Sequence, residues 1–141
     1  SAFAHVMTLE KIPQTIGTFI TSVADTRFEF LLVVTLILFV VGCVMETSPA
    51  ILILTPILVP LLSNYNISPV AFGVVMIINL GIGIVTPPVG VNLYVAASLV
   101  NAKVEQVINR HLLAYIILSV IVLIVLMAFP QIIMILPNLM V

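Results

Sequence analysis

The sequence predicts an all-α integral membrane protein in which two apolar segments are interrupted inside the lipid. Hydrophobic residues make up 63% of the 141 residues and charged residues only 6%, whereas a water-soluble domain carries about a quarter of its residues as charged side chains. The mean hydropathy of +1.43 points the same way. The interruptions, at 45–49 and 81–90, carry polar residues, glycine and proline between apolar runs. Lipid is therefore the predicted solvent, and the interruptions are the predicted places of function.

Composition excludes several classes of function. The net charge is −1 and the four basic residues are scattered, so no basic patch for a nucleic acid is present. Cys43 is the single cysteine, which excludes a disulfide framework and a cysteine-ligated metal site. His5 and His111 lie near the ends of predicted elements, with no ligand cluster beside either. Neither a nucleophile with its base nor a phosphate-binding glycine loop is recognisable, so we expect no enzyme, no cofactor and no ATP-driven pump.

The first 28 residues predict the end of a preceding helix (1–9) followed by an amphipathic arm. The chain does not begin with Met and lacks the basic start of a signal peptide, so we expect a fragment or one piece of a split chain. From Ile12 to Val23, apolar side chains recur at helical spacing among Thr and Gln side chains, which indicates a helix lying in the membrane interface. The alternative is a partly polar spanning helix packed against other helices.

Residues 29–64 predict a re-entrant hairpin whose tip lies at 45–49. The run from Phe30 to Val44 is almost wholly apolar, and a helix of that length extends only about 22 Å, less than the roughly 30 Å hydrocarbon core. A second apolar run and a polar loop follow the tip and return the chain to the surface from which it entered. The alternative is one continuous helix kinked at Pro56 and Pro60.

Residues 69–101 predict one discontinuous transmembrane helix, broken at 81–90. Three glycines, two prolines and two asparagines fall between Asn79 and Asn92, and no continuous helix tolerates that density. The apolar runs on either side are each too short to span a membrane but together cross it. The freed backbone groups must then be covered by protein, water or an ion.

The C-terminal part predicts a surface helix followed by a spanning helix. Residues 102–111 hold most of the remaining charge and form a short cytoplasmic helix, and residues 112–136 form the clearest transmembrane helix. Lys103 and Arg110 flank the start of that helix, whereas its far end carries no charge. The positive-inside tendency therefore puts the C-terminus outside.

At each interruption a hydroxyl residue precedes a proline and an apolar helix. Ser48 before Pro49, and Thr86 before Pro87, are preferred pairs for an N-cap and a first helical residue. The free N–H groups of such half-helices suit a carboxylate, and the carbonyls that end the preceding helices suit a monovalent cation. Plain helix kinking is the alternative. Glu46 is the only acid at depth, and either it has a functional role or it bonds N–H groups of the tip.

These segments resemble the C-terminal portion of the large (M) subunit of tripartite ATP-independent periplasmic (TRAP) transporters. The resemblance is carried by GCVMETSPAILILTPILVPLL (42–62) and SPVAFGVVMIINLGIGIVTPPVGVNLYVA (68–96), followed by a closing hydrophobic helix. TPPVGVNLYVA is its most specific part. The resemblance covers nearly the whole chain, but a complete large subunit has two such repeats and only the second is present.

The resemblance implies the second half of an inverted-repeat, elevator-type fold of the ion transporter superfamily. It implies sodium-coupled import of an organic acid, such as a C4-dicarboxylate or sialic acid, across the bacterial inner membrane. The outside, where the positive-inside tendency puts the C-terminus, would then be the periplasm. The implied partners are a small membrane (Q) subunit, the remaining part of the large subunit, a periplasmic substrate-binding protein and the lipid bilayer. The competing hypothesis is a channel or a structural membrane subunit without ion coupling.

The resemblance and the chemistry of the interruptions together assign two sets of residues. The predicted sodium ligands are Gly42, Glu46, Thr47, Gly83 and Thr86. The predicted substrate contacts are Ser48, Pro87, Pro88, Gly90 and Asn92. No other metal is predicted.

Overall fold

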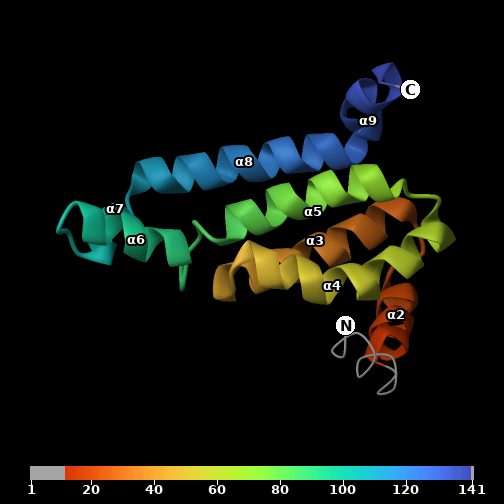
Figure 1. Cartoon of the computed structure of the whole chain (residues 1–141), viewed down its shortest axis with the longest axis horizontal. Helices are drawn as coiled ribbons and strands as arrows, with labels where there is room; N and C mark the ends of the chain where they lie inside the picture. The colour runs from red at the N-terminus through yellow and green to blue at the C-terminus, as the bar shows by residue number, and fades with distance from the viewer. Residues whose placement is uncertain (1–11, 141) are drawn as a thin grey trace.

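Helices form the secondary structure of the described residues, 12–140, in the computed structural model (Figure 1). An all-α fold is therefore confirmed for this part of the chain. Residues 1–9, predicted as the end of a preceding helix, lie outside the described residues. The elements in chain order are α2 (Ile12–Val23), α3 (Arg27–Val44), α4 (Thr47–Leu62), the 3-10 turn η1 (Ser63–Tyr65), α5 (Pro69–Gly83), α6 (Val91–Leu99), α7 (Val104–Val107), α8 (Arg110–Ala128) and α9 (Pro130–Leu139).

Helices α3 and α4 lie side by side and run in opposite directions (Figure 1). A capping box starts α3, because Thr26 Oγ1 accepts from the Glu29 N–H at 3.3 Å and the Glu29 carboxylate accepts from the Thr26 N–H at 3.0 Å. Met45 and Glu46 are both extended, with ψ near 159° and 150°. The chain therefore leaves the helix and turns back, which excludes one continuous kinked helix.

The hairpin limbs are longer than the sequence predicted. Helix α3 has 18 residues, about 27 Å, because the capping box starts it before the apolar run begins. Among the described residues, three helical segments are long and apolar enough to cross a membrane: Arg27–Val44, Thr47–Tyr65 and Arg110–Ala128. Length alone therefore does not distinguish a re-entrant limb from a spanning helix.

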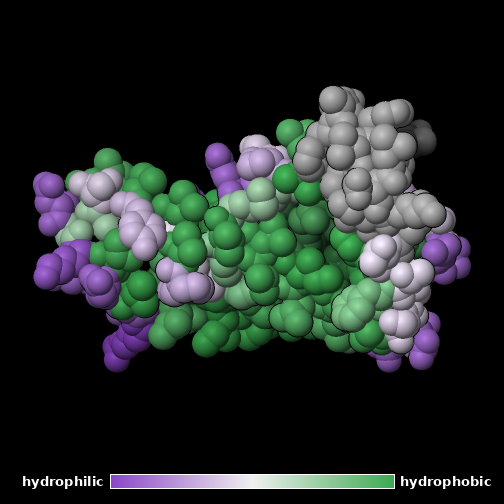
Figure 2. Space-filling model, turned by 90° about the horizontal axis from the view of Figure 1, so that it is seen from below, coloured by the Kyte–Doolittle hydropathy of each residue, from purple (hydrophilic) through white to green (hydrophobic). Residues whose placement is uncertain are grey.

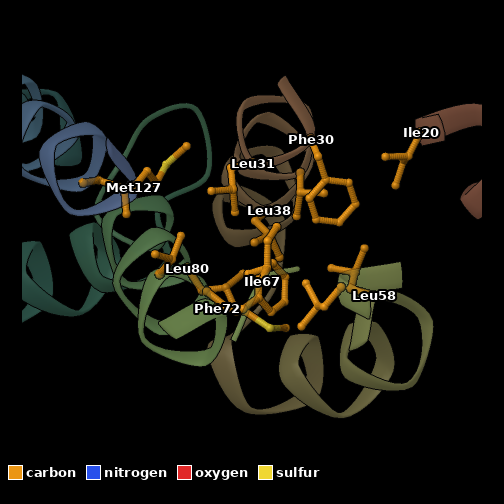
Figure 3. Close-up of a cluster of buried hydrophobic side chains, with 14 of the residues drawn as sticks. Ile20, Phe30, Leu31, Leu38, Leu58, Ile67, Phe72, Leu80 and Met127 are labelled. Carbon is orange, nitrogen blue, oxygen red and sulfur yellow. The ribbon is translucent and has the colours of Figure 1, made fainter. Parts of the chain in front are cut away.

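The hydrophobic core lies where α3, α4, α5 and α8 meet, with α5 at the centre. Figure 3 shows its side chains pointing toward one another from separate helices. Phe30 also stacks on Tyr65, with ring centroids 4.4 Å apart, and the Tyr65 hydroxyl donates to the Ala24 carbonyl at 2.8 Å. These contacts join the open end of the hairpin to the end of α2. The fully buried side chains include Phe30, Leu38, Leu58, Leu62, Leu80 and Leu123.

Helix α2 lies across the open end of the hairpin (Figure 1). Gly17 and Ile20 are buried, and a Cβ on Gly17 would lie 3.0 Å from Leu61 Cδ2 of α4. On the exposed side, hydroxyls bond back to carbonyls of the same helix, as Thr21 does to Gly17 at 2.9 Å. The helix therefore has the buried face and the polar face that its sequence pattern predicts.

The C-terminal part differs from its predicted extent at both ends. The surface helix is reduced to the four-residue α7, because Asn109 caps α8 by accepting from the N–H groups of His111 and Leu112 at 2.9 and 3.1 Å. Helix α8 ends at Ala128, since Pro130 has no N–H to continue the ladder. That proline instead starts α9, which leaves at a steep angle (Figure 1).

Most of the surface between the two ends is apolar. Figure 2 shows hydrophobic residues along the middle of one face and polar residues mainly at the ends. Leu36 of α3, Leu52 of α4 and Leu118 of α8 are 67%, 75% and 61% exposed. A surface of this kind marks contact with lipid or with further protein.

Candidate functional site where the hairpin turn meets the helix break

The hairpin turn (Met45, Glu46) and the irregular segment between α5 and α6, here called the break (84–90), meet at two glycines. A Cβ on Gly83 would lie 2.6 Å from the Gly42 carbonyl carbon and 2.7 Å from its Cα. Only residues without a side chain let two backbones approach so closely. The last turns of α3 and α5 thus lie against each other, and Gly42 and Gly83, both predicted ligands, are brought together.

A backbone hydrogen bond ties the break to the hairpin. The Gly90 N–H donates to the Cys43 carbonyl at 3.3 Å, and the Asn92 N–H donates to the Ile84 carbonyl at 3.1 Å, closing the break on itself. Gly90 has a φ of +48°, in the left-handed region that glycine adopts most readily. The chain therefore turns into α6 at a position that only glycine fits without strain.

Thr86 lies inside the break and is 9% exposed. Its N–H donates to the Gly83 carbonyl at 2.9 Å, and its hydroxyl donates to the Ile82 carbonyl at 2.6 Å. A hydroxyl that donates one bond keeps lone pairs with which it can accept or ligate. Thr86 is thus an enclosed oxygen one turn beyond the glycine contact.

Both predicted helix caps are wrong. Gly90, not Thr86, is the N-cap of α6, because the Thr86 hydroxyl bonds back to α5. Glu46, not Ser48, is the N-cap of α4. Pro49 therefore stands at the third helical position, which suits it because N–H groups of the first turn have no partner within the helix. Neither N-cap makes a side-chain hydrogen bond. At the start of α6, however, the Asn92 and Leu93 N–H groups already donate to the Ile84 and Gly90 carbonyls, at 3.1 and 2.7 Å.

The meeting point is rich in neutral oxygens. Within the described residues, the carbonyls from Val85 to Val89 accept no backbone hydrogen bond, and neither do those of Gly42, Val44 and Met45. Such oxygens are the ligands that hard cations take. The same part of the chain holds no group of three or more His, Cys, Asp or Glu, so it offers no ligand set for a transition metal.

The remaining predicted site residues lie nearer the surface. The Glu46 side chain makes no capping bond to the turn, so the structural role considered for it is absent. The exposed residues are Glu46, Ser48, Pro88 and Asn92, and the half-buried ones are Thr47 and Pro87, which is joined to Pro88 by a cis peptide bond.

Sequence reasoning assigned no role to Asn79, which is fully buried in α5. Its Nδ2 donates to the Thr35 carbonyl of α3 at 2.8 Å, and its Oδ1 has no partner among the described residues. The sequence did offer one signal for it: burying the polar side chain of an asparagine in an apolar membrane helix costs free energy, so such a residue is a candidate for a functional role.

Along the long axis of the molecule, the hairpin turn lies level with the middle of α8 rather than with its start (Figure 1). Thr35 Oγ1 donates to Met127 Sδ at 3.3 Å, and α3 and α8 run in opposite directions. Because the two helices are antiparallel, the end of α3 at Val44, nine residues after Thr35, comes level with Leu118, nine residues before Met127. Leu118 follows the start of α8 by eight residues, or about 12 Å.

The chain is similar to known transporter subunits. A family model described as "Tripartite ATP-independent periplasmic transporter, DctM component" matches residues 1–132. The isethionate TRAP transporter permease protein DctMQ of Oleidesulfovibrio alaskensis is 45% identical over 74% of this chain and 16% of that protein. The C4-dicarboxylate TRAP transporter large permease protein DctM of Pseudomonas aeruginosa is 38% identical over 96% of this chain and 32% of its own length. The sialic acid TRAP transporter large permease protein SiaM of Vibrio cholerae is 34% identical over 99% and 32%. The chain thus spans a third or less of these relatives.

Proposed function

Because the chain belongs to the DctM family of tripartite ATP-independent periplasmic transporters, as a large membrane subunit or part of one, we propose that it takes part in sodium-coupled import of an organic acid. The observation that carries this proposal is the backbone contact of Gly42 with Gly83. It brings the end of α3, where the Gly42 and Val44 carbonyls are unpaired within the described residues, against the end of α5, beyond which the carbonyls from Val85 to Val89 are likewise unpaired. Interrupted helices that meet at depth are the sites of secondary transporters.

The sodium ion would lie between the hairpin turn and the break. The carbonyl oxygens of Gly42, Val44 and Met45, and those of the break from Val85 to Val89, accept no backbone hydrogen bond from the described part of the chain. With the hydroxyl of Thr86 they are neutral ligands of the kind a hard monovalent cation takes. Thr47 is half-buried at the start of α4 and adds a second hydroxyl. Glu46 stands exposed at the turn and contributes charge at the entrance rather than a buried ligand.

The substrate would lie by the N-termini of α4 and α6, where the helix dipoles favour its carboxylate. The free N–H groups would come mainly from the first turn of α4, because those of Gly90, Asn92 and Leu93 already have carbonyl partners. Ser48 and the N-cap Gly90 mark these two ends, and Pro87, Pro88 and Asn92 border them. Relatives named for C4-dicarboxylates and for sialic acid transport acids of this class. The proposed substrate is therefore a carboxylate.

The register of α3 along α8 supports the re-entrant reading of the hairpin. If α8 crosses the bilayer, a limb that ends about 12 Å short of its start ends within the lipid. The hairpin and the discontinuous α5–α6 helix then form the second repeat of an elevator-type fold. Helix α2 is proposed to lie in the interface at the hairpin's open end, where its polar face meets water or headgroups.

The proposed assembly contains the rest of the large subunit, a small membrane subunit and a periplasmic binding protein, in the bacterial inner membrane. Lys103 and Arg110 would lie on the cytoplasmic side. The C-terminus would then lie in the periplasm. The large apolar exposed surface supports contact with lipid and with these membrane partners.

Sodium-dependent uptake by the complete transporter tests the proposal. We expect Thr86→Val and Thr47→Val to raise the sodium concentration for half-maximal uptake about fivefold to twentyfold, because each removes one hydroxyl ligand. Thr21→Val is the matched control, since Thr21 makes the same type of hydroxyl bond to the carbonyl four residues before it, at 2.9 Å, but lies in α2. Unchanged sodium dependence in both site variants contradicts the assignment.

The same uptake assay tests the alternative function and the substrate. Uptake that needs no binding protein would favour a channel. Labelled dicarboxylate and labelled sialic acid, compared in the same assay, would identify the substrate.

A further inference from the structure

One side-chain hydrogen bond joins α5 to α3 in the described part of the chain. Asn79, with none of its surface exposed, donates from Nδ2 to the Thr35 carbonyl at 2.8 Å. The neighbouring contacts between these helices come from apolar side chains such as Leu38 and Leu80. Apolar side chains tolerate a shift of one helix along another, whereas a buried amide bond selects one register.

The bond lies close to the meeting point of hairpin and break. Asn79 precedes Gly83 by about one helical turn, and Thr35 precedes Gly42 by about two. Helices α3 and α5 lie side by side and run in the same direction (Figure 1), so the amide bond and the glycine contact hold the pair at successive heights. The break begins directly after Gly83. A shift of α5 along α3 would therefore move the oxygens of the break relative to the hairpin turn.

Stability alone does not account for an amide at this position. The Oδ1 of Asn79 is buried without a partner in the described residues, and an unpaired buried acceptor opposes folding. An apolar side chain of similar size would avoid that cost. Selection of one helix register is the best-attested use of such a residue.

We propose that Asn79 is a positioning residue, whose bond to the Thr35 carbonyl keeps the break in register with the hairpin turn and thereby sets the affinity for sodium. The functional consequence rests on the sodium coupling proposed above. The tether itself is measurable without sodium, so the two proposals can fail separately.

The test compares Asn79→Leu with the matched control Thr35→Val in the complete transporter. The control removes the hydroxyl that donates to Met127 Sδ but keeps the carbonyl that accepts from Asn79. The first readout is hydrogen exchange of the peptide covering 84–92 in sodium-free buffer. We expect about fivefold to tenfold faster exchange in Asn79→Leu, because the Gly90 to Cys43 bond is no longer held in register. The second readout is the sodium concentration for half-maximal uptake, expected to rise by a similar factor with the substrate KM at saturating sodium unchanged.

Each outcome decides between the proposals. Unchanged exchange and unchanged sodium dependence in a folded Asn79→Leu transporter overturn the positioning role. Equal changes in Thr35→Val also overturn it, because the accepting carbonyl is intact there. Faster exchange in a transporter whose wild-type uptake ignores sodium keeps the tether and rejects the proposed coupling. If Asn79→Leu does not assemble, Asn79→Ala removes the same donor without added bulk, and the same two readouts apply.

Discussion

The two interruptions look alike in sequence but are built differently. The hairpin turn needs only two extended residues, Met45 and Glu46, and leaves Glu46 exposed. The break extends over 84–90, encloses Thr86 at 9% exposure and bonds to the carbonyl of Cys43. The hairpin turn thus reverses the chain within two residues, whereas the break supplies the buried hydroxyl oxygen of Thr86.

The difference indicates that the glycines and the hydroxyl residues have separate roles: the glycines allow close backbone packing, and the hydroxyls supply oxygen ligands. Glycines at 42 and 83 let the two segments touch, and glycine at 90 allows the left-handed turn into α6. Thr86, by contrast, carries its hydroxyl within the break, whose carbonyls from Val85 to Val89 accept no backbone hydrogen bond from the residues described. Substitutions at the glycines should therefore act on assembly, and those at the hydroxyls on ion binding.

The largest expected effect comes from separating the two regions. Gly83→Ala adds a Cβ that would lie 2.6 Å from the backbone of Gly42. Because a backbone cannot yield as a flexible side chain does, we expect a loss of about 3 kcal/mol in the free energy of unfolding, measured as lower thermal stability of the complex. Gly81→Ala is the control in the same helix, with nothing within 4 Å of the new Cβ. Equal stability of the two variants would contradict the close approach.

A smaller loss is expected inside the break. Gly90→Ala forces a φ of +48° on a residue with a side chain, which costs about 1–2 kcal/mol. Thermal unfolding of the complex measures it. Gly73→Ala, whose new Cβ would meet nothing within 4 Å, should be neutral or stabilising because alanine favours a helix. If both variants are equally stable, the break does not depend on its left-handed turn.

The smallest effect is expected at the hairpin turn. Glu46 is exposed and makes no capping bond, so Glu46→Gln should change the free energy of unfolding by less than about 0.5 kcal/mol. Its effect on sodium dependence should be smaller than that of Thr86→Val, because an exposed charge is screened by solvent. A larger effect than that of Thr86→Val would reverse the comparison and make the turn the principal ion site.

Several features could be predicted from particular residues because their causes are local. The polar turn after the apolar run ending at Val44, and the glycines and prolines between Gly81 and Gly90, indicated where helices stop. The caps were missed because Ser48 and Thr86 both have cap chemistry, and the alternative bonding of Thr86 to Ile82 depends on where the chain goes next. Asn109 was missed for a simpler reason, since its cap lies within a stretch assigned to one continuous surface helix.

By itself, the sequence determined that this chain is helical, apolar and interrupted twice, because hydropathy and the missing proline N–H act on each segment alone. Only the tertiary structure decided which atoms meet: that Gly83 lies against Gly42, that Gly90 bonds to Cys43, and that Asn79 reaches Thr35. The physical reason is that these contacts join positions distant in sequence, and their geometry is set by the packing of α3 against α5 rather than by the propensity of any residue.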